Sequence, residues 1–178
     1  MYEYLKYPRL KELQQSLMPY VKKCNTGINA VGHLIEDNIE YKKLIEFFNV
    51  KEYITRIDML KILPINSVSK KQAHIDVSDY RYSLNIPVLN YEDSSTIFYK
   101  PNSKIIIKKA FPIMSEDKNN IPVNLYQFDI TEKSEILGEY PTKTIFCMDT
   151  QVPHYIHNPS LDFRYSLLVR LNTKFKME

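Results

Sequence analysis

The sequence predicts a mainly β fold, a sandwich or a barrel-like jelly roll, with helices at its N-terminal end. Two observations lead to this prediction. Apolar residues at helical spacing are confined to residues 1–52. From about residue 53, short segments rich in β-branched and aromatic residues follow one another, separated by Asn, Asp, Pro and Ser. A run of strands without helices between them is typical of an all-β core, on which we expect the N-terminal helices to pack.

Length and composition indicate one domain. The 178 residues are 44% hydrophobic and 25% charged, which is ordinary for a globular protein. We expect a single domain over residues 1–178, in which residues 1–52 give helical support and residues 53–171 form the β core. No apolar run approaches the roughly 18 residues of a membrane span, and the N-terminus carries no secretory signal, so we expect a cytoplasmic protein without a membrane partner. A net charge of +3 does not indicate a nucleic-acid partner.

Two helices are predicted in the first 50 residues. Pro8 suits the first turn of a helix over residues 8–23, because a first-turn N–H needs no partner within the helix. The apolar positions of this helix recur at helical spacing and are Leu10, Leu13, Leu17 and Val21. Asn25 and Gly27 interrupt the pattern, and Asp37 is expected to cap a second helix.

The rest of the chain predicts short strands. The first covers residues 56–63 and ends at Pro64, where a loop begins. The others are expected over residues 81–89, 95–99, 104–108, 121–129, 143–148, 152–157 and 163–171. No internal repeat or linker suggests a second domain.

His74 and Asp76 are candidate metal ligands. One residue, Ile75, separates them, so the alternation of an extended chain places both side chains on one side of the backbone. Two histidines and one carboxylate are the usual protein ligands of an Fe(II) centre that must also bind an oxo-acid and dioxygen. The pair alone indicates little, because such short motifs arise easily by chance and a loop histidine is the ordinary alternative.

His154 is the candidate third ligand, and His157 is its rival. Arg164 follows His154 by ten residues and Ser166 comes two residues later, whereas His157 has Leu167 at the same offset. Two adjacent antiparallel strands would bring His154 and Arg164 into one cavity. The guanidinium can donate two parallel hydrogen bonds to a carboxylate, and the Ser166 hydroxyl on the same face can donate a third.

These residues, in this order, resemble the Fe(II)/2-oxoglutarate-dependent oxygenase superfamily, and in particular its aspartyl/asparaginyl hydroxylase-like branch. The resemblance covers about residues 54–171. It implies a double-stranded β-helix, which is a cupin-like jelly-roll barrel. It also implies that His74, Asp76 and His154 bind Fe(II), that Arg164 and Ser166 hold the co-substrate 2-oxoglutarate, and that dioxygen is the second co-substrate.

Three further residues are candidates for binding 2-oxoglutarate. In the hydroxylase-like branch, polar residues on the strand after the first ligands help to bind the oxo-acid, and Asn85 and Ser83 share one face of that predicted strand. The hydroxyl of Tyr99 could reach the same carboxylate. Its alternative is an ordinary half-buried aromatic residue, since the chain has 14 Tyr.

Arg170 and Asp149 each have two interpretations. Arg170 shares a strand face with Arg164, so it is an alternative anion binder or a residue at the rim that meets the substrate. Asp149 could orient a metal-bound histidine or could cap a turn.

We therefore expect an Fe(II)- and 2-oxoglutarate-dependent dioxygenase that hydroxylates a C–H bond of an amino acid, a peptide side chain or a small metabolite. The sequence does not choose among these substrates, and it gives no oligomeric state. One alternative is a cupin-like metal-binding protein that does not use 2-oxoglutarate, because a jelly-roll barrel hosts many chemistries. The other is a non-catalytic β-sandwich binding protein, in which His74 and His154 never meet.

Overall fold

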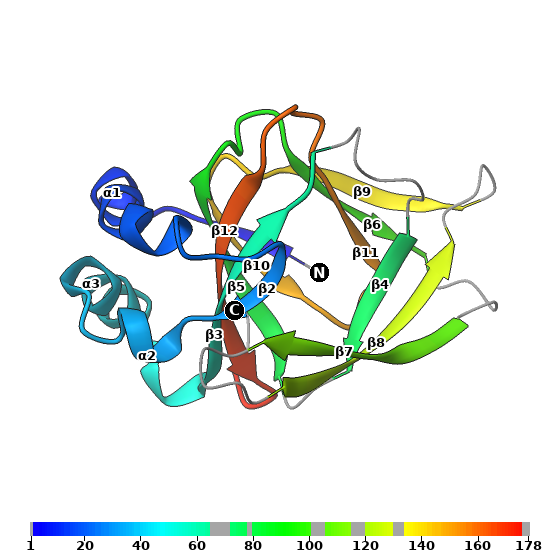
Figure 1. Cartoon of the computed structure of the whole chain (residues 1–178), viewed down its shortest axis with the longest axis horizontal. Helices are drawn as coiled ribbons and strands as arrows, with labels where there is room; N and C mark the ends of the chain where they lie inside the picture. The colour runs from blue at the N-terminus through cyan, green and yellow to red at the C-terminus, as the bar shows by residue number, and fades with distance from the viewer. Residues whose placement is uncertain are drawn as a thin grey trace.

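The chain is arranged in layers, with helices on one face of a β-sheet and a second sheet on its other face (Figure 1). A computed structural model describes residues 2–64, 72–77, 80–100, 106–114, 120–129 and 134–175. The helices are α1 (Leu10–Val21), α2 (Gly32–Ile35) and α3 (Ile39–Phe48), followed by the 3-10 turn η1 (Lys51–Tyr53).

The described strands form two antiparallel sheets of six strands each. Sheet A has the order β1 (Tyr2–Leu5), β10 (Ile145–Asp149), β5 (Tyr80–Leu89), β12 (Arg164–Asn172), β3 (Ile54–Ile62) and β2 (Gly27–Ala30). Sheet B has the order β7 (Ile106–Met114), β8 (Asn120–Asp129), β4 (Gln72–Val77), β11 (His154–His157), β6 (Ser95–Tyr99) and β9 (Ile136–Pro141).

The main apolar core lies between the helices and sheet A. Strand β12 is central in this sheet, and its alternation directs Leu167 and Val169 towards the helical layer. Leu84 on the neighbouring β5 does the same, and Leu13 and Leu17 of α1 pack against this face. Burying one such side chain contributes about 1.5–3 kcal/mol, so this face fixes the orientation of the strands.

The other face of sheet A carries polar side chains into the space between the sheets. On β12 these are Arg164, Ser166 and Arg170, and on β5 they are Ser83 and Asn85. All five are buried. Because a strand cannot shift its register by one residue without exchanging its two faces, the apolar core also fixes which residues face inward.

The fold confirms the mainly β prediction with N-terminal helices on the outside of one sheet. It also corrects several details. Residues 1–52 are not only helical, because they contribute the edge strands β1 and β2 to sheet A, and β9 was not predicted either. The cap of α3 is Asn38, whose side chain accepts a hydrogen bond from the Tyr41 N–H at 3.0 Å, and not Asp37. The described strands do not close into a barrel.

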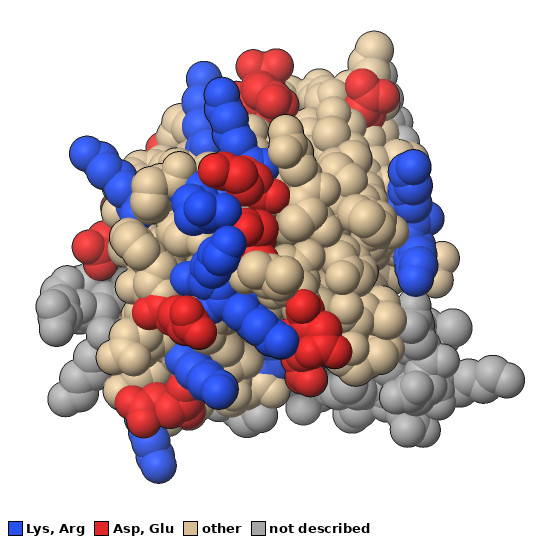
Figure 2. All heavy atoms as spheres, turned by 90° about the vertical axis from the view of Figure 1, so that its left-hand side faces the viewer, with Lys and Arg blue, Asp and Glu red and all other residues tan. Residues whose placement is uncertain are grey.

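None of the described helices is long and apolar enough to cross a membrane. The outer face of the helical layer carries Lys and Arg side chains interspersed with Asp and Glu (Figure 2). One ion pair there joins two helices: Arg9, at the start of α1, donates from Nε and Nη2 to the two carboxylate oxygens of Glu40 in α3, at 2.9 and 2.8 Å. Lys43 adds a third hydrogen bond at 2.8 Å.

We predict that Glu40→Gln lowers the melting temperature at pH 7 and that the difference from wild type disappears in acid. The hydrogen bonds from Arg9 and then Lys43 lower the pKa of Glu40 from 4.5 to about 2. A depressed pKa contributes stability above pH 4.5, and this contribution is lost as the pH falls towards 2. Thermal melts of both proteins between pH 2 and 7 measure it.

The matched control is Asp37→Asn, which removes a pair with Lys42 whose partners are both exposed. We expect no change there, because exposed ion pairs contribute little. If the melting temperature of wild type still exceeds that of Glu40→Gln by the same amount at pH 2, the ion pair of Glu40 is not the source of the difference.

Candidate metal and anion site

The structure brings His74, Asp76 and His154 together between the two sheets. Strand β4 carries His74 and Asp76, and His154 of the adjacent β11 is in register with His74. The possible ligand atoms of the three side chains all lie within 4.8 Å of one another. The two imidazole rings have their centroids 4.4 Å apart, and His74 Nε2 lies 3.7 Å from Asp76 Oδ1. The arrangement is that of a metal site with donors from two strands.

Local structure fixes each donor. The Asp76 N–H donates to the Thr150 carbonyl at 3.0 Å, which ties β4 to the turn that precedes β11. His154 Nδ1 lies 2.9 Å from the Val152 carbonyl oxygen. Because a carbonyl only accepts, Nδ1 carries the proton, and Nε2 keeps the lone pair that a metal needs.

Burial keeps both histidines neutral. It lowers the pKa of His74 to about 3, helped by the proximity of His154. Burial also lowers the pKa of His154. For Asp76, burial is the largest single effect and would raise the pKa, but Arg170, the two histidines and the Tyr80 hydroxyl together outweigh it and the net shift is downward. Neutral imidazoles and an ionised carboxylate are the protonation states in which these groups bind a metal.

The three residues fit a divalent ion. Two ligand atoms bound at right angles to one ion at about 2.1 Å stand about 3 Å apart, so the 3.7 Å between His74 and Asp76 closes with a small side-chain movement. Two imidazoles and one carboxylate suit Fe(II) and also other first-row ions. The donor set indicates a metal site but does not by itself choose the metal or the chemistry.

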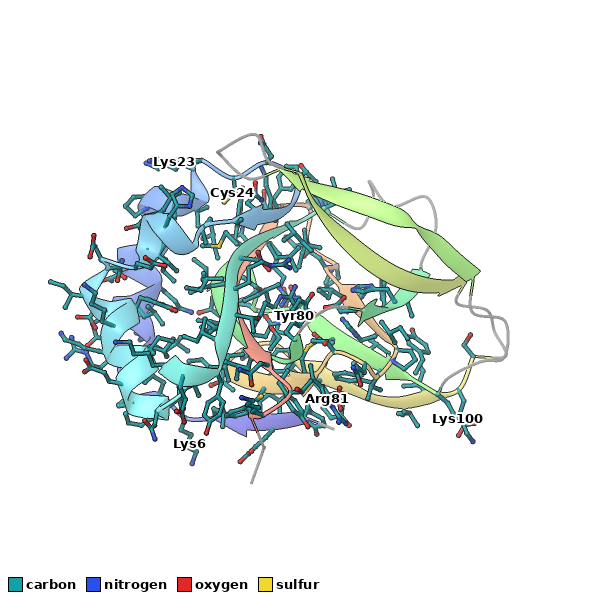
Figure 3. All side chains as sticks on the ribbon, turned by 90° about the horizontal axis from the view of Figure 1, so that it is seen from below. Lys6, Lys23, Cys24, Tyr80, Arg81 and Lys100 are labelled. Carbon is teal, nitrogen blue, oxygen red and sulfur yellow. The ribbon has the colours of Figure 1, made fainter. Side chains whose placement is uncertain are left out.

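Arg170 is bound within the protein and does not serve as a free anion binder. Its Nη1 donates to Asp76 Oδ2 and its Nε to Asp58 Oδ2, both at 3.2 Å. Asp58 Oδ2 also accepts from Arg56 Nε at 2.9 Å. Tyr80, which Figure 3 shows in the interior of the molecule, donates its hydroxyl to Asp76 Oδ2 at 3.1 Å and lies with its ring centroid 4.7 Å from the Arg170 guanidinium.

Arg164 is the contrasting case. It is fully buried, and its Nη2 donates to Ser166 Oγ at 3.1 Å. Among the described residues, its Nε and Nη1 have no hydrogen-bond partner, and burial leaves its charge without a carboxylate. Burial lowers the pKa of Arg164 to about 9. Because a guanidinium stays protonated in proteins, this buried positive charge lacks an anion.

A cavity of about 310 Å³ opens beside the three candidate ligands. His74, Asp76, His154 and Arg170 line it together with Asn85. The rest of its wall is largely aliphatic and includes Ile28, Leu60, Ile62, Leu63, Met148, Ile156 and Leu168. The chain therefore offers a mainly apolar chamber with the candidate metal ligands on its wall.

Ser83 and Asn85 also face the interior. Ser83 Oγ and Asn85 Oδ1 are buried without a hydrogen-bond partner among the described residues. In register, Asn85 lies opposite Leu168 of β12 and Ser83 opposite Arg170. The prediction that they share one face of their strand is confirmed, and β12 places Arg164 and Ser166 on the same face of sheet A.

The structure does not bring the other candidates to the ligands. Tyr99 packs in a cluster with Ala73, whose side chain is on the opposite face of β4 from His74. The ring of His157 lies 6.3 Å from that of Tyr155, on the opposite side of β11 from His154. Asp149 accepts from Arg81 and from the Gln151 N–H, so it caps the turn.

Sequence reasoning missed Arg56, Asp58 and Tyr80. A signal was present for the first two, because they alternate on one face of a predicted strand, where paired charges imply a buried network. Nothing in the sequence distinguished Tyr80 from the other tyrosines.

Comparison with models of known protein families, with curated proteins and with solved structures finds no match to this chain.

We predict opposite effects on stability for the two buried arginines of β12. Arg164→Met should leave the ligand-free protein as stable as wild type or more stable, because it replaces an uncompensated buried charge by an apolar side chain. Arg170→Met should destabilise by about 3–5 kcal/mol, because it leaves the carboxylates of Asp58 and Asp76 without their partner. Denaturant unfolding measures both. If both variants are destabilised equally, the two arginines do not differ in whether their buried charge is paired.

Metal binding should stabilise the wild type and depend on His154 but not on His157. At a concentration 100-fold above its Kd, an ion that binds only the folded state adds about 2.7 kcal/mol. We expect Mn²⁺ to raise the melting temperature of wild type and of His157→Ala, with EDTA reversing it, and to leave that of His154→Ala unchanged. If His154→Ala and His157→Ala lose the Mn²⁺-dependent stabilisation equally, His154 is not established as the third ligand.

Proposed function

We propose that the protein is an Fe(II)- and 2-oxoglutarate-dependent dioxygenase that hydroxylates a C–H bond. One observation carries the proposal: two histidines and a carboxylate come together between the sheets, and β12 turns toward the same space a fully buried arginine that has no counter-ion among the described residues. The first group suits a metal with open coordination positions, and the second suits a carboxylate. A co-substrate with a keto acid at one end and a carboxylate at the other meets both requirements.

The order of the strands supports a double-stranded β-helix. From β3 to β6 the chain passes alternately through sheet A and sheet B, and it does so again from β9 to β12. The resulting orders are β10-β5-β12-β3 in one sheet and β4-β11-β6-β9 in the other. Two windings of this kind are what the proposed jelly-roll topology requires. A site in such a fold would lie between its two sheets, and His74, Asp76 and His154 come together in that space.

The roles of the residues follow from their chemistry. His74, Asp76 and His154 would hold Fe(II), and Arg164 with Ser166 would bind the distal carboxylate of 2-oxoglutarate. Asn85 and Ser83 would contribute their unpaired polar atoms to the same molecule. When bound, Fe(II) would let dioxygen act as the oxidant: one of its oxygen atoms would enter the substrate C–H bond, and the other would enter succinate, which forms from 2-oxoglutarate as carbon dioxide leaves.

The cavity wall would shape the environment of the substrate. Its aliphatic side chains exclude water from the space beside the ligands and accommodate an apolar part of the substrate. The substrate itself, an amino acid, a peptide side chain or a small metabolite, is the open part of the proposal.

The two alternatives fit the geometry less well. A metal protein that does not use 2-oxoglutarate gives no role to the uncompensated Arg164. A β-sandwich in which the histidines never meet is inconsistent with ring centroids 4.4 Å apart.

The decisive experiment is an anaerobic titration of the protein with Fe(II) and 2-oxoglutarate. We predict the weak visible charge-transfer absorption of a keto acid chelated to Fe(II). Arg164→Met should weaken 2-oxoglutarate binding by roughly 10-fold or more, as expected for loss of a charge-assisted pair of hydrogen bonds, while Fe(II) alone still binds. Arg9→Met, on the helical layer, is the control and should behave as wild type. No absorption in the wild type would refute the mechanism.

A further inference from the structure

The two oxygens of Asp76 are in different situations. Oδ2 accepts hydrogen bonds from the Tyr80 hydroxyl at 3.1 Å and from Arg170 Nη1 at 3.2 Å. Oδ1 is the oxygen 3.7 Å from His74 Nε2, on the side where the metal ligands converge. Hydrogen bonds within the protein thus occupy Oδ2 of Asp76, while Oδ1 faces the two histidines.

Arg170 is itself held in place. Its Nε donates to Asp58, which is fully buried and also accepts from Arg56. The four side chains form a row of alternating charge, Arg56, Asp58, Arg170 and Asp76, that crosses from β3 through β12 to β4. The ring of Tyr80 lies against the guanidinium groups of both arginines, with its centroid 5.4 Å from Arg56 and 4.7 Å from Arg170.

Such a row is expensive as a source of stability alone. Removing charges from water costs several kcal/mol per ion, and well-packed apolar residues often stabilise the same space as well or better. The row fixes the orientation of the Arg170 guanidinium and therefore of the Asp76 carboxylate, because a planar guanidinium bonded to two carboxylates cannot rotate without breaking one of the bonds.

We propose that Arg170, anchored by Asp58 and assisted by Tyr80, is a positioning residue that restricts Asp76 to a single metal-binding oxygen, Oδ1. This inference rests on the metal-binding part of the proposed function and names the device that shapes it. With one oxygen from Asp76 and one nitrogen from each histidine, a six-coordinate ion keeps three open positions. A keto acid that binds through two atoms and one dioxygen molecule need three. A carboxylate bound through both oxygens would leave only two.

The test uses Co²⁺ as a spectroscopic probe, without 2-oxoglutarate and without turnover. The visible bands of Co²⁺ report the coordination number and geometry of the site, and the titration gives the affinity. The variants are Tyr80→Phe, Asp58→Asn, Arg170→Lys and Arg170→Met. Arg9→Met is the control, because it removes a doubly hydrogen-bonded arginine–carboxylate pair from the helical layer. Circular dichroism verifies that each variant is folded.

We expect wild type and Arg9→Met to give the same weak six-coordinate spectrum and the same affinity. Tyr80→Phe and Asp58→Asn should change the Co²⁺ bands and weaken binding, with losses that reach 10- to 100-fold where an orienting partner of a ligand is fully removed. Arg170→Lys should retain more affinity than Arg170→Met, because it restores the charge but not the two-carboxylate geometry. If Arg170→Met does not fold, Tyr80→Phe and Asp58→Asn decide the matter.

Two results would overturn the inference, and they are distinguishable. If wild type binds Co²⁺ and the folded Tyr80→Phe and Asp58→Asn variants keep its spectrum and affinity, the charge row is only structural, and the proposed function stands. If wild type binds no Co²⁺, the metal centre and the positioning role both fail.

Discussion

The alternation of β12 is the constraint on which the site depends. This strand lies between β5 and β3 in sheet A and is buried on both faces. Leu167, Val169 and Leu171 face the helices, and their burial fixes the register. The same register directs Arg164, Ser166 and Arg170 into the interior, where sheet B supplies the candidate metal ligands. The helical layer therefore acts on the site indirectly, by fixing which face of β12 turns inward.

The two arginines on that face illustrate two uses of a buried charge. Arg170 has two carboxylates as partners and belongs to the permanent structure. Arg164 has only a serine hydroxyl, so its desolvation is not offset within the described part of the chain. A ligand that brings a carboxylate completes this partial set of interactions. Such a site costs stability in the free protein and recovers it on binding, as is common for functional sites.

The sequence predicted which candidate residues share a strand face, but not how the strands are arranged. His74 could be grouped with Asp76, and Arg164 with Ser166, because residues two apart in an extended chain lie on one face. His154 was chosen for its ten-residue spacing to Arg164, on the expectation that adjacent antiparallel strands carry both, and this expectation is wrong, because β11 and β12 lie in different sheets. Edge strands β1 and β2 were missed because four residues are too few for a periodic pattern. Asp58 and Tyr80 could not be assigned to Asp76, because their contacts depend on how β3, β5 and β4 pack. Of the two interpretations of Tyr99, its packing with Ala73 favours the ordinary aromatic residue.

We propose that one interior holds a metal at one end and a carboxylate at the other. The most direct measurement is an anaerobic crystal structure with Mn²⁺ and 2-oxoglutarate, with the ion located by its anomalous scattering. We predict the ion at about 2.0–2.2 Å from His74, Asp76 Oδ1 and His154, with the distal carboxylate of 2-oxoglutarate on Arg164 and Ser166. An ion at other residues, or a 2-oxoglutarate molecule bound away from Arg164, would contradict the account.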